Sequence, residues 1–362
     1  MPTPARVAVL PQAPGPLRIE EVDIPDPGPT QVVVRQFASG VCHSQLHQMH
    51  RPRQNNVILG HESTGVVLHT GSAVNHVKEG DIVLVTWVPR DASNAKQAPV
   101  GAVLQASDGP AIGNVFTWAD HTIVDQQFVV KVDPNIERDV TAIIGCAVMT
   151  GAGAVMNTAG VQPGQSVAIF GVGGVGLSAV VGAKMCGADP IIAVDLSDEK
   201  LEFAKRFGAT HGINAGEVDP VEAIHDLTRQ ENVFSMGRRP ISGADYTFDC
   251  IGAKVTMEQI IPACRPGQFG VCQGGTAVLV GIPQTKMELD PLPIVTQEKH
   301  FIGSIGGSCS PDRDFPTFLK WFEDGDLDLG SMVTERYPLE KINEATTALE
   351  NGQISGRAIL EF

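Results

Sequence analysis

The hydrophobic pattern divides the chain into regions of different texture. In the first 140 residues, short apolar runs are separated by proline and glycine pairs, which is typical of β-strands joined by turns. We predict strands at residues 6–10, 31–36, 65–68, 81–85, 121–124 and 129–132. This region is therefore expected to be β-rich.

The middle of the chain alternates between buried strands and helices. Apolar runs predict strands at residues 166–170, 191–194, 246–250 and 276–280, and helices are expected at residues 175–186 and 198–207. Strand–helix–strand alternation predicts a doubly wound parallel sheet. After residue 293 the pattern is mixed again, and it ends with a helix at 315–324 and a strand at 358–362.

These patterns predict an α/β protein of two domains. A β-rich domain is expected from both ends of the chain, residues 1–150 and 296–362, and a nucleotide-binding domain from residues 151–295. The length of 362 residues and the hydrophobic content of 43% agree with two domains that each bury a core.

Charge and cysteine content argue against several kinds of partner and indicate a cellular compartment. The formal net charge of −15 at pH 7 opposes binding to nucleic acid or to anionic membranes. We find no apolar run long enough for a membrane span and no secretory signal. The seven cysteines are scattered, without the spacing of small disulfide-bonded domains. We expect a cytoplasmic protein.

A glycine-rich turn follows the predicted strand at 166–170. Its sequence is G-x-G-x-x-G at the start of a helix, Gly171-Val172-Gly173-Gly174-Val175-Gly176. The first glycine permits a tight turn, the second lets the backbone approach a pyrophosphate, and the third lets the helix pack against the strand. This context predicts a dinucleotide site.

An acidic residue at the end of the next strand selects the dinucleotide. Asp195 lies 19 residues after Gly176, where a carboxylate is expected to bind the hydroxyls of the adenosine ribose. The same carboxylate would repel a 2′-phosphate, so we predict NAD rather than NADP. Lys200 is either a further contact to the adenosine end or a solvated surface lysine.

A cysteine, a histidine and a second cysteine suggest a metal. Cys42, His61 and Cys146 supply two thiolates and an imidazole, a set that suits zinc and leaves a fourth position open, as catalytic zinc requires. Spacing alone leaves open the alternative that each is an ordinary buried side chain.

Taken together, these motifs resemble the zinc-containing alcohol dehydrogenases of the medium-chain dehydrogenase/reductase superfamily. The likeness covers nearly the whole chain and includes the segments GHE at 60–62, GCAVMTG at 145–151, FGVGGVGLS at 170–178, DCIG at 249–252, VLVGIP at 278–283 and GRAILEF at 356–362. It implies a GroES-like catalytic domain around an inserted Rossmann domain. It also implies hydride transfer between an alcohol, with primary alcohols favoured, and NAD, which interconverts the alcohol and its aldehyde or ketone.

The resemblance assigns roles around the metal. Cys42, His61 and Cys146 would bind one catalytic zinc, and Glu62 would lie beside it or replace a ligand at times; the alternative for Glu62 is a buried ion-pair partner. Ser44 would hydrogen-bond the alcohol oxygen, and His47 would pass the proton to water; the alternative for both is capping of a loop.

The resemblance also assigns contacts to the cofactor and substrate. His43 and Arg357 would bind the pyrophosphate, Thr150 would pack against the nicotinamide, and the carbonyl of Val280 would hold its carboxamide. Trp87 would line the substrate pocket; its alternative is an ordinary place in the core.

The sequence departs from its relatives at three places. Residues 89–116 hold none of the four cysteines that bind a structural zinc in many relatives, so we predict one zinc per chain and a loop that is held by packing alone or is mobile. Gln45 stands where relatives commonly have an acidic residue. Residues 231–242 form an insertion that either caps the adenosine end or is a surface feature.

Two other functions and several properties stay open. A zinc-free, NADPH-dependent reductase of the same superfamily would lack the Cys–His–Cys set, and a non-catalytic binding protein would have lost the relay or the ligands. The alcohol and the physiological direction cannot be read. We expect a homodimer in which the strand at 276–280 pairs across a two-fold axis, with a tetramer as the alternative.

Overall fold

The computed structural model describes residues 2–91, 98–234 and 240–362. The chain forms two compact units, unit 1 from Met1–Ala147 and Ser310–Phe362 and unit 2 from Val148–Cys309. Residues 296–309, assigned from the sequence to the first domain, lie in unit 2, because β18 (His300–Gly303) pairs with β17 (Thr276–Leu279). Among the described residues, no helix is long and apolar enough to cross a membrane.

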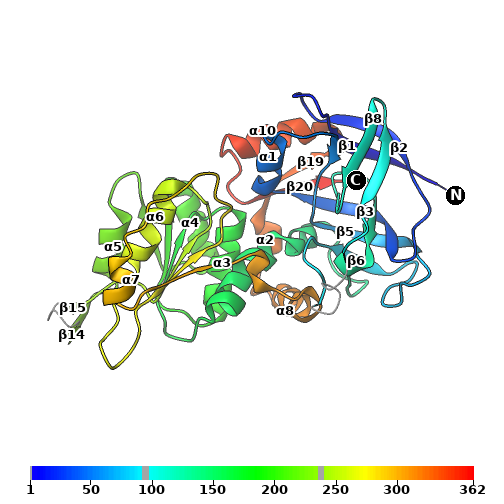
Figure 1. The fold of residues 1–362 in the computed structure, drawn as a ribbon. Coiled ribbons are helices and arrows are strands. Elements are labelled where there is room, and N and C mark those ends of the chain that lie inside the picture. Colours follow the sequence, from blue (N-terminus) through cyan, green and yellow to red (C-terminus); the bar gives the residue numbers. More distant parts are fainter. Residues whose placement is uncertain (1, 92–97, 235–239) are drawn as a thin grey trace. The chain divides into compact units, whose positions relative to one another are not determined.

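Unit 1 is built from two sheets, and both ends of the chain contribute to it (Figure 1). One sheet has the strand order β2-β1-β4-β8-β7; the other has β10-β6-β5-β3-β20-β19, with β9 also paired to β3. Its strands are β1 (Thr3–Leu10), β2 (Arg18–Ile24), β3 (Gln31–Val41), β4 (Asn56–Ile58), β5 (Ser63–Thr70), β6 (Ile82–Val85), β7 (Ala102–Ala106), β8 (Gly109–Gly113), β9 (His121–Asp125), β10 (Val129–Lys131), β19 (Val333–Pro338) and β20 (Arg357–Glu361). Its helices are α1 (His43–Met49), α8 (Pro311–Glu323), α9 (Leu329–Met332) and α10 (Ile342–Glu350), with a 3-10 helix at Val140–Gly145.

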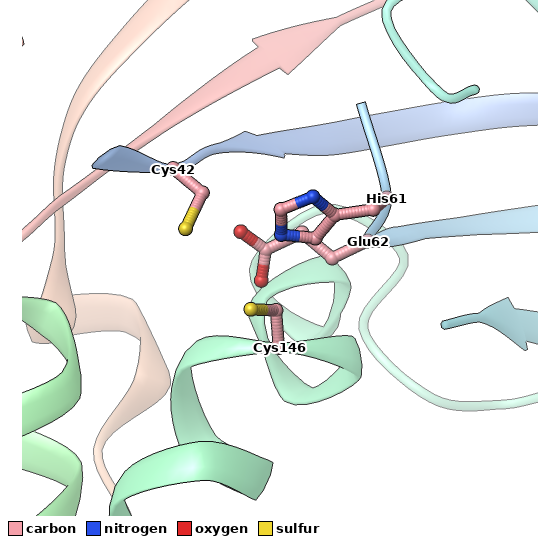
Figure 2. A group of neighbouring side chains, drawn as sticks. All are labelled: Cys42, His61, Glu62 and Cys146. Carbon is pink, nitrogen blue, oxygen red and sulfur yellow. The ribbon is translucent and has the colours of Figure 1, made fainter. Parts of the chain in front are cut away.

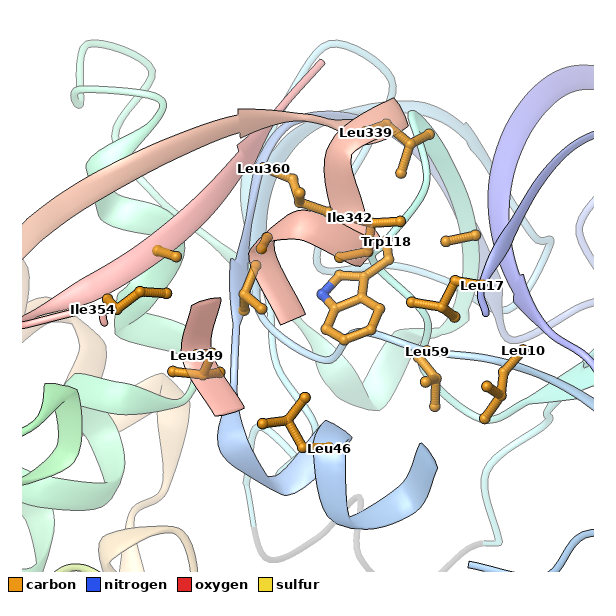
Figure 3. Packing of buried hydrophobic residues seen from close by; sticks show 14 residues of the cluster. Leu10, Leu17, Leu46, Leu59, Trp118, Leu339, Ile342, Leu349, Ile354 and Leu360 are labelled. Atoms are coloured by element: carbon orange, nitrogen blue, oxygen red, sulfur yellow. The ribbon is translucent and has the colours of Figure 1, made fainter. Parts of the chain in front are cut away.

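A tryptophan fills one core of unit 1. Trp118 is 0% exposed, and apolar side chains of α1 and α10, including Leu46 and Ile342, belong to the same cluster (Figure 3). The indole N–H donates to the carbonyl of Gly40, 3.1 Å away, near the end of β3. This buried polar group is therefore satisfied, and the core is tied to the backbone that leads to Cys42.

The cysteine-free segment 89–116 is not a loop held by packing alone. Residues 92–97 lie outside the described part, but residues 102–113 form the β7–β8 hairpin, whose strand β8 pairs in parallel with β4. The carboxylate of Asp108 accepts from both terminal nitrogens of Arg18, at 2.9 and 2.8 Å, and from Asn56 Nδ2 at 2.8 Å. Backbone pairing and charged hydrogen bonds, rather than packing alone, hold this hairpin.

Unit 2 contains a six-stranded parallel sheet in the order β13-β12-β11-β16-β17-β18. This order, with the chain reversing direction across the sheet beside β11, is that of a doubly wound dinucleotide-binding domain. Figure 1 shows its helices arranged around the sheet. The further strands are β11 (Val167–Phe170), β12 (Ile191–Asp195), β13 (His211–Asn214) and β16 (Tyr246–Asp249); the helices are α3 (Gly174–Met185), α4 (Asp198–Phe207), α5 (Pro220–Leu227), α6 (Lys254–Ala263) and α7 (Leu292–Thr296).

One expectation for unit 2 changes with the structure, whereas the role of the insertion at 231–242 stays a prediction. The strand expected at 276–280 is β17, which is hydrogen-bonded to β16 and β18 on its two sides and so has no free edge for a second subunit. The insertion at 231–242 contains β14 (Gln230–Phe234) and β15 (Pro240–Ile241), which pair antiparallel, while residues 235–239 lie outside the described part.

The α2 helix (Ala147–Gly153) connects the two units in the chain.

Candidate functional site

Four side chains from three separate segments of unit 1 meet at one point. The ligand atoms of Cys42, His61, Glu62 and Cys146 all lie within 4.8 Å of one another, and Figure 2 shows the side chains directed toward a common centre. Both cysteines and Glu62 are buried, and His61 is half-buried. The sequence-predicted ligand set is thus brought together, and Glu62 joins it.

Strand register explains why these segments meet. Ser39 of β3 pairs with Ser63 of β5, so the end of β3, followed by Cys42, lies beside the start of β5, which His61 and Glu62 precede. Cys42 also begins α1 as its N-cap. The hydroxyl of Thr86, just after β6, donates to the carbonyl of Gly145 at 2.7 Å and so fixes the segment that carries Cys146.

The two thiols of the cluster are coupled. A hydrogen bond from Cys146, followed by the positive charge of Arg357, lowers the pKa of Cys42 well below its ordinary value. The same hydrogen bond, together with burial, raises the pKa of Cys146. The arrangement therefore favours a thiolate at Cys42 with Cys146 as its donor, and thiolate is the form that binds metals.

Glu62 forms a buried ion pair with Arg357. Nη2 of Arg357, on β20, donates to one carboxylate oxygen, and the N–H of Ala147 donates to the other at 3.2 Å. A Cβ added to Gly40 would lie 2.2 Å from Glu62 Oε1, so a larger residue there would displace the carboxylate. Burial raises the pKa of Glu62, and the charge of Arg357 opposes the shift.

The sequence leaves open that Glu62 is a buried ion-pair partner, but it does not identify Arg357 as the other member of the pair. Arg357 was expected to bind a pyrophosphate, and Glu62 to lie beside the metal; no local signal links two residues that are 295 positions apart. Nε of Arg357 is buried and has no partner among the described residues. The pyrophosphate role of Arg357 and of His43, which is exposed on the first turn of α1, stays a prediction.

His61 has one ring nitrogen engaged and one without a partner. Nδ1 lies 2.7 Å from Nε2 of Gln45, whereas Nε2 of His61 is buried and has no hydrogen-bond partner among the residues that the structure describes. A buried nitrogen without a partner is costly unless a ligand occupies it.

The donor set fits a zinc ion. Two sulfurs and one imidazole nitrogen, bound at about 2.0–2.3 Å in a tetrahedron, are separated by roughly 3.5–3.8 Å, and the observed separations of up to 4.8 Å need only a small contraction. The nitrogen of His61 that has no partner among the described residues would be the third ligand. The carboxylate of Glu62 is held by Arg357 and Ala147, which leaves the fourth position to another group.

The expected relay and pocket residues lie around this cluster. Ser44 and His47 are half-buried on α1, and the Ser44 hydroxyl lies 3.4 Å from the Cys42 sulfur. Burial lowers the pKa of His47. Trp87 is half-buried rather than part of the core, its ring stands edge-on to His61 with centroids 6.2 Å apart, and its Nε1 has no partner among the described residues.

The glycine-rich turn in unit 2 has the geometry that the sequence predicts. Gly171 follows β11 with a φ of +85°, which favours glycine, and Gly173 is the N-cap of α3. A Cβ on Gly176 would lie 1.8 Å from the carbonyl oxygen of Gly171, so only glycine permits this contact between turn and helix. Nothing lies within 4 Å of a Cβ placed on Gly173.

The remaining cofactor candidates lie near this turn or at strand ends of unit 2. Asp195 ends β12, and its carboxylate accepts from the N–H of Val172 at 3.0 Å. Val280 follows β17 and is buried. Thr150 lies on α2 with its hydroxyl buried and unpaired within the described residues, and Lys200 lies in the first turn of α4. Their cofactor contacts stay predictions.

Comparisons with known proteins find the same family in both parts of the chain. A family model described as the alcohol dehydrogenase GroES-like domain matches residues 28–134, and one described as zinc-binding dehydrogenase matches residues 174–324. The chain is 32% identical to an alcohol dehydrogenase class-3 of Cereibacter sphaeroides, over 99% of each protein.

Two solved structures share the fold over the whole chain. An alcohol dehydrogenase zinc-binding domain protein from Burkholderia ambifaria is 30% identical, with a TM-score of 0.88 and full coverage of both chains. Benzyl alcohol dehydrogenase from Acinetobacter calcoaceticus is 26% identical, with a TM-score of 0.84 over 99% of each chain. The predicted GroES-like and Rossmann architecture is confirmed, and the chain belongs to the zinc-dependent alcohol dehydrogenases of the medium-chain dehydrogenase/reductase superfamily.

Proposed function

We propose that this protein oxidises primary alcohols to aldehydes, reversibly, with NAD and with one catalytic zinc per chain held by Cys42, His61 and Cys146. The buried cluster of two thiols and an imidazole with an orphaned nitrogen carries the proposal. Bound zinc would supply the Lewis acidity that makes a hydroxyl easier to deprotonate, and NAD would supply the hydride acceptor.

The chain's own residues would move the proton. The Ser44 hydroxyl is close enough to the Cys42 sulfur to reach a hydroxyl bound at the cluster and accept its proton. His47 lies three residues further along α1, and because burial lowers its pKa it is neutral near pH 7 and able to take up that proton. The ion pair of Glu62 and Arg357 would hold the segments around the cluster in place and would not take part in the proton transfer.

The cofactor proposal rests on the turn after β11. Gly171, Gly173 and Gly176 leave backbone N–H groups at the start of α3 for a pyrophosphate. Asp195 lies beside this turn, where its negative charge disfavours a 2′-phosphate. His43, Arg357, Thr150, Val280 and Lys200 are the further cofactor contacts that we propose.

The preference for primary alcohols has two supports. The structural neighbour from Acinetobacter calcoaceticus is a benzyl alcohol dehydrogenase, and benzyl alcohol is a primary alcohol with an aromatic group. Trp87 presents an aromatic edge to His61, a surface suited to an apolar substituent on the substrate. We therefore favour aromatic primary alcohols as first test substrates.

We also propose a cytoplasmic homodimer. All seven cysteines lie in the described residues and none of them forms a disulfide there, which suits a reducing compartment. In unit 2 the strand β18 ends the parallel sheet, and on the preceding α7 Leu292 and Val295 are 63% and 76% exposed. A free strand edge beside exposed apolar side chains favours pairing with a second copy, now through β18 rather than β17. Light scattering of the purified protein tests this.

Metal content and turnover test the main proposal. We expect about one zinc per chain by mass spectrometry and NAD-dependent oxidation of benzyl alcohol. Cys146→Ala should lose both, whereas Cys264→Ala, which removes another buried thiol outside the cluster, should keep both. Two zincs per chain would contradict the single site. Full activity without zinc would move the protein to the metal-free reductases.

A further inference from the structure

We propose that Gln45 is a positioning residue that fixes which nitrogen of His61 carries the proton and thereby weakens the binding of zinc to the cluster. The inference rests on the proposed function for the identity of the metal. It concerns the hydrogen bonds of a side chain that is not itself a ligand.

Gln45 is enclosed next to the cluster. It is 3% exposed on α1, and its carboxamide lies between the backbone of Gly60 and the ring of His61. The carbonyl oxygen Oε1 accepts from the N–H of Gly60, and the nitrogen Nε2 lies 2.7 Å from His61 Nδ1. Nε2 also reaches Oε1 of Gln48 at 3.5 Å.

The backbone N–H of Gly60 decides the orientation of this carboxamide. A backbone N–H only donates, so the atom of Gln45 that faces it must be the oxygen. The peptide that carries this N–H is held in place, because its carbonyl group, that of Leu59, accepts from the N–H groups of Thr117 and Trp118, both at 3.0 Å. The amide nitrogen must therefore face His61.

The carboxamide in turn decides the tautomer of His61. The NH2 group of Gln45 is a donor, so His61 Nδ1 must accept and the ring proton must lie on Nε2. That nitrogen is the one without a partner among the described residues, and it is the one available to a metal. A ligating nitrogen carries no proton.

Zinc binding therefore conflicts with this arrangement. When His61 Nε2 binds zinc as a neutral imidazole, Nδ1 must carry the proton and faces the NH2 group of Gln45, donor against donor. Ligating histidines usually give this N–H to a carboxylate, a carbonyl or a water. The carboxamide has one oxygen, and Gly60 already occupies it, so one N–H stays unpaired in the zinc-bound state.

A carboxylate of the same length would remove the conflict. In Gln45→Glu, one oxygen would accept from Gly60 and the other from His61 Nδ1. Loss of such outer partners typically changes metal affinity about 10–100-fold, so restoring one should tighten zinc binding by about tenfold or more. Gln45→Leu, which keeps the bulk but accepts from neither group, should not tighten it.

The first test is the zinc dissociation constant of wild type, Gln45→Glu and Gln45→Leu, measured by competition with a chromophoric chelator. Tighter binding in the glutamate variant alone supports the inference. Unchanged or weaker binding in a folded glutamate variant overturns it while leaving the proposed function intact, provided that wild type binds zinc and turns over. A wild type that binds no zinc overturns both.

The second test needs no variant at position 45. Nitrogen NMR of histidine-labelled wild type, with the His61 signals identified by their loss in His61→Gln, reports the protonated nitrogen directly. We expect the proton on Nε2 in the zinc-free protein and on Nδ1 after zinc is added. A zinc-free ring already protonated on Nδ1 would overturn the inference, because a merely space-filling Gln45 would not set the tautomer.

Discussion

Removing Arg357 should expose the cost of a buried, unpaired carboxylate at Glu62. Glu62 is 0% exposed and Arg357 is 5% exposed, and within the described part of the chain the carboxylate has only the N–H of Ala147 as a second donor. The backbone at Gly40 and at Gly145 lies close against the side chain of Glu62. Breaking such a pair by removing one partner costs about 3–5 kcal/mol, because the remaining charge stays desolvated. We therefore expect Arg357→Met to lower the free energy of unfolding by that amount.

A double-mutant cycle separates the pair from general packing. Urea unfolding would be followed for wild type, Arg357→Met, Glu62→Gln and the double variant, all with a chelator present so that zinc does not contribute. Each single change removes one member of the pair and leaves the other without it, whereas the double variant removes both members, so its loss should be far smaller than the sum of the two single losses. A loss in Arg357→Met of about 1 kcal/mol or less, as for an exposed pair, or simple additivity would refute the reasoning.

The pH dependence of this cycle has a defined sign. Burial raises the pKa of Glu62 above its unfolded value, and removing Arg357 should raise it further. A carboxyl whose pKa is raised on folding contributes fully below its unfolded pKa, and that contribution is lost as the pH rises through the folded pKa. The deficit of Arg357→Met should accordingly be largest near pH 8 and shrink toward pH 5, and a constant deficit would contradict the assignment to Glu62.

Further predictions concern the turn, the core and a buried lysine. Gly176→Ala places a Cβ 1.8 Å from the carbonyl oxygen of Gly171, so the backbone must shift at a cost of about 1–3 kcal/mol. We expect this shift to weaken NADH binding, measured by fluorescence titration, and unchanged binding would contradict the close contact. Trp118→Phe leaves the Gly40 carbonyl without its indole donor and should lower the unfolding free energy by at least about 1–3 kcal/mol in denaturant titrations. Burial lowers the pKa of Lys299, so the charged form of the lysine is penalised in the folded state. In urea unfolding, wild type should therefore gain stability relative to Lys299→Met as the pH rises from 7 to 9.5. A difference in unfolding free energy that does not change with pH would refute this.

Local patterns in the sequence were sufficient for the core elements of unit 2. The helix expected at 198–207 is α4 with the same bounds, and the helix expected at 175–186 is α3, shifted by one residue. Such elements follow from hydrophobic periodicity and from a glycine turn whose steric demands are local. The family likewise follows from motifs that each lie within a few residues of one another.

Features that depend on distant contacts were not accessible in this way. The hairpin at 102–113 was expected to be a loop, because a run of alanine, glycine and proline gives little strand signal, yet pairing with β4 and the Arg18–Asp108 bonds stabilise it. The free sheet edge was assigned to residues 276–280 instead of β18, since strand order is a property of the sheet and not of any one strand. The ion pair of Glu62 with Arg357 joins opposite ends of the chain.

The site itself depends on strand register more than on the motifs. Ser39 pairs with Ser63, Ser63 pairs with Val85, and Val41 pairs with Ala358. These pairings bring Cys42, His61 and Trp87, which follow or precede strands, to the same end of the sheet as Arg357 at the start of β20, and the Thr86–Gly145 hydrogen bond brings the segment with Cys146 there. Because successive side chains point to opposite faces, a slip of one residue between β3 and β5 would turn one set of these side chains away from the other. The proposed ligands that precede or follow strands are therefore positioned by the seven-stranded sheet of unit 1, and we propose that the hydrogen bonds of Gln45 influence how tightly they hold the metal.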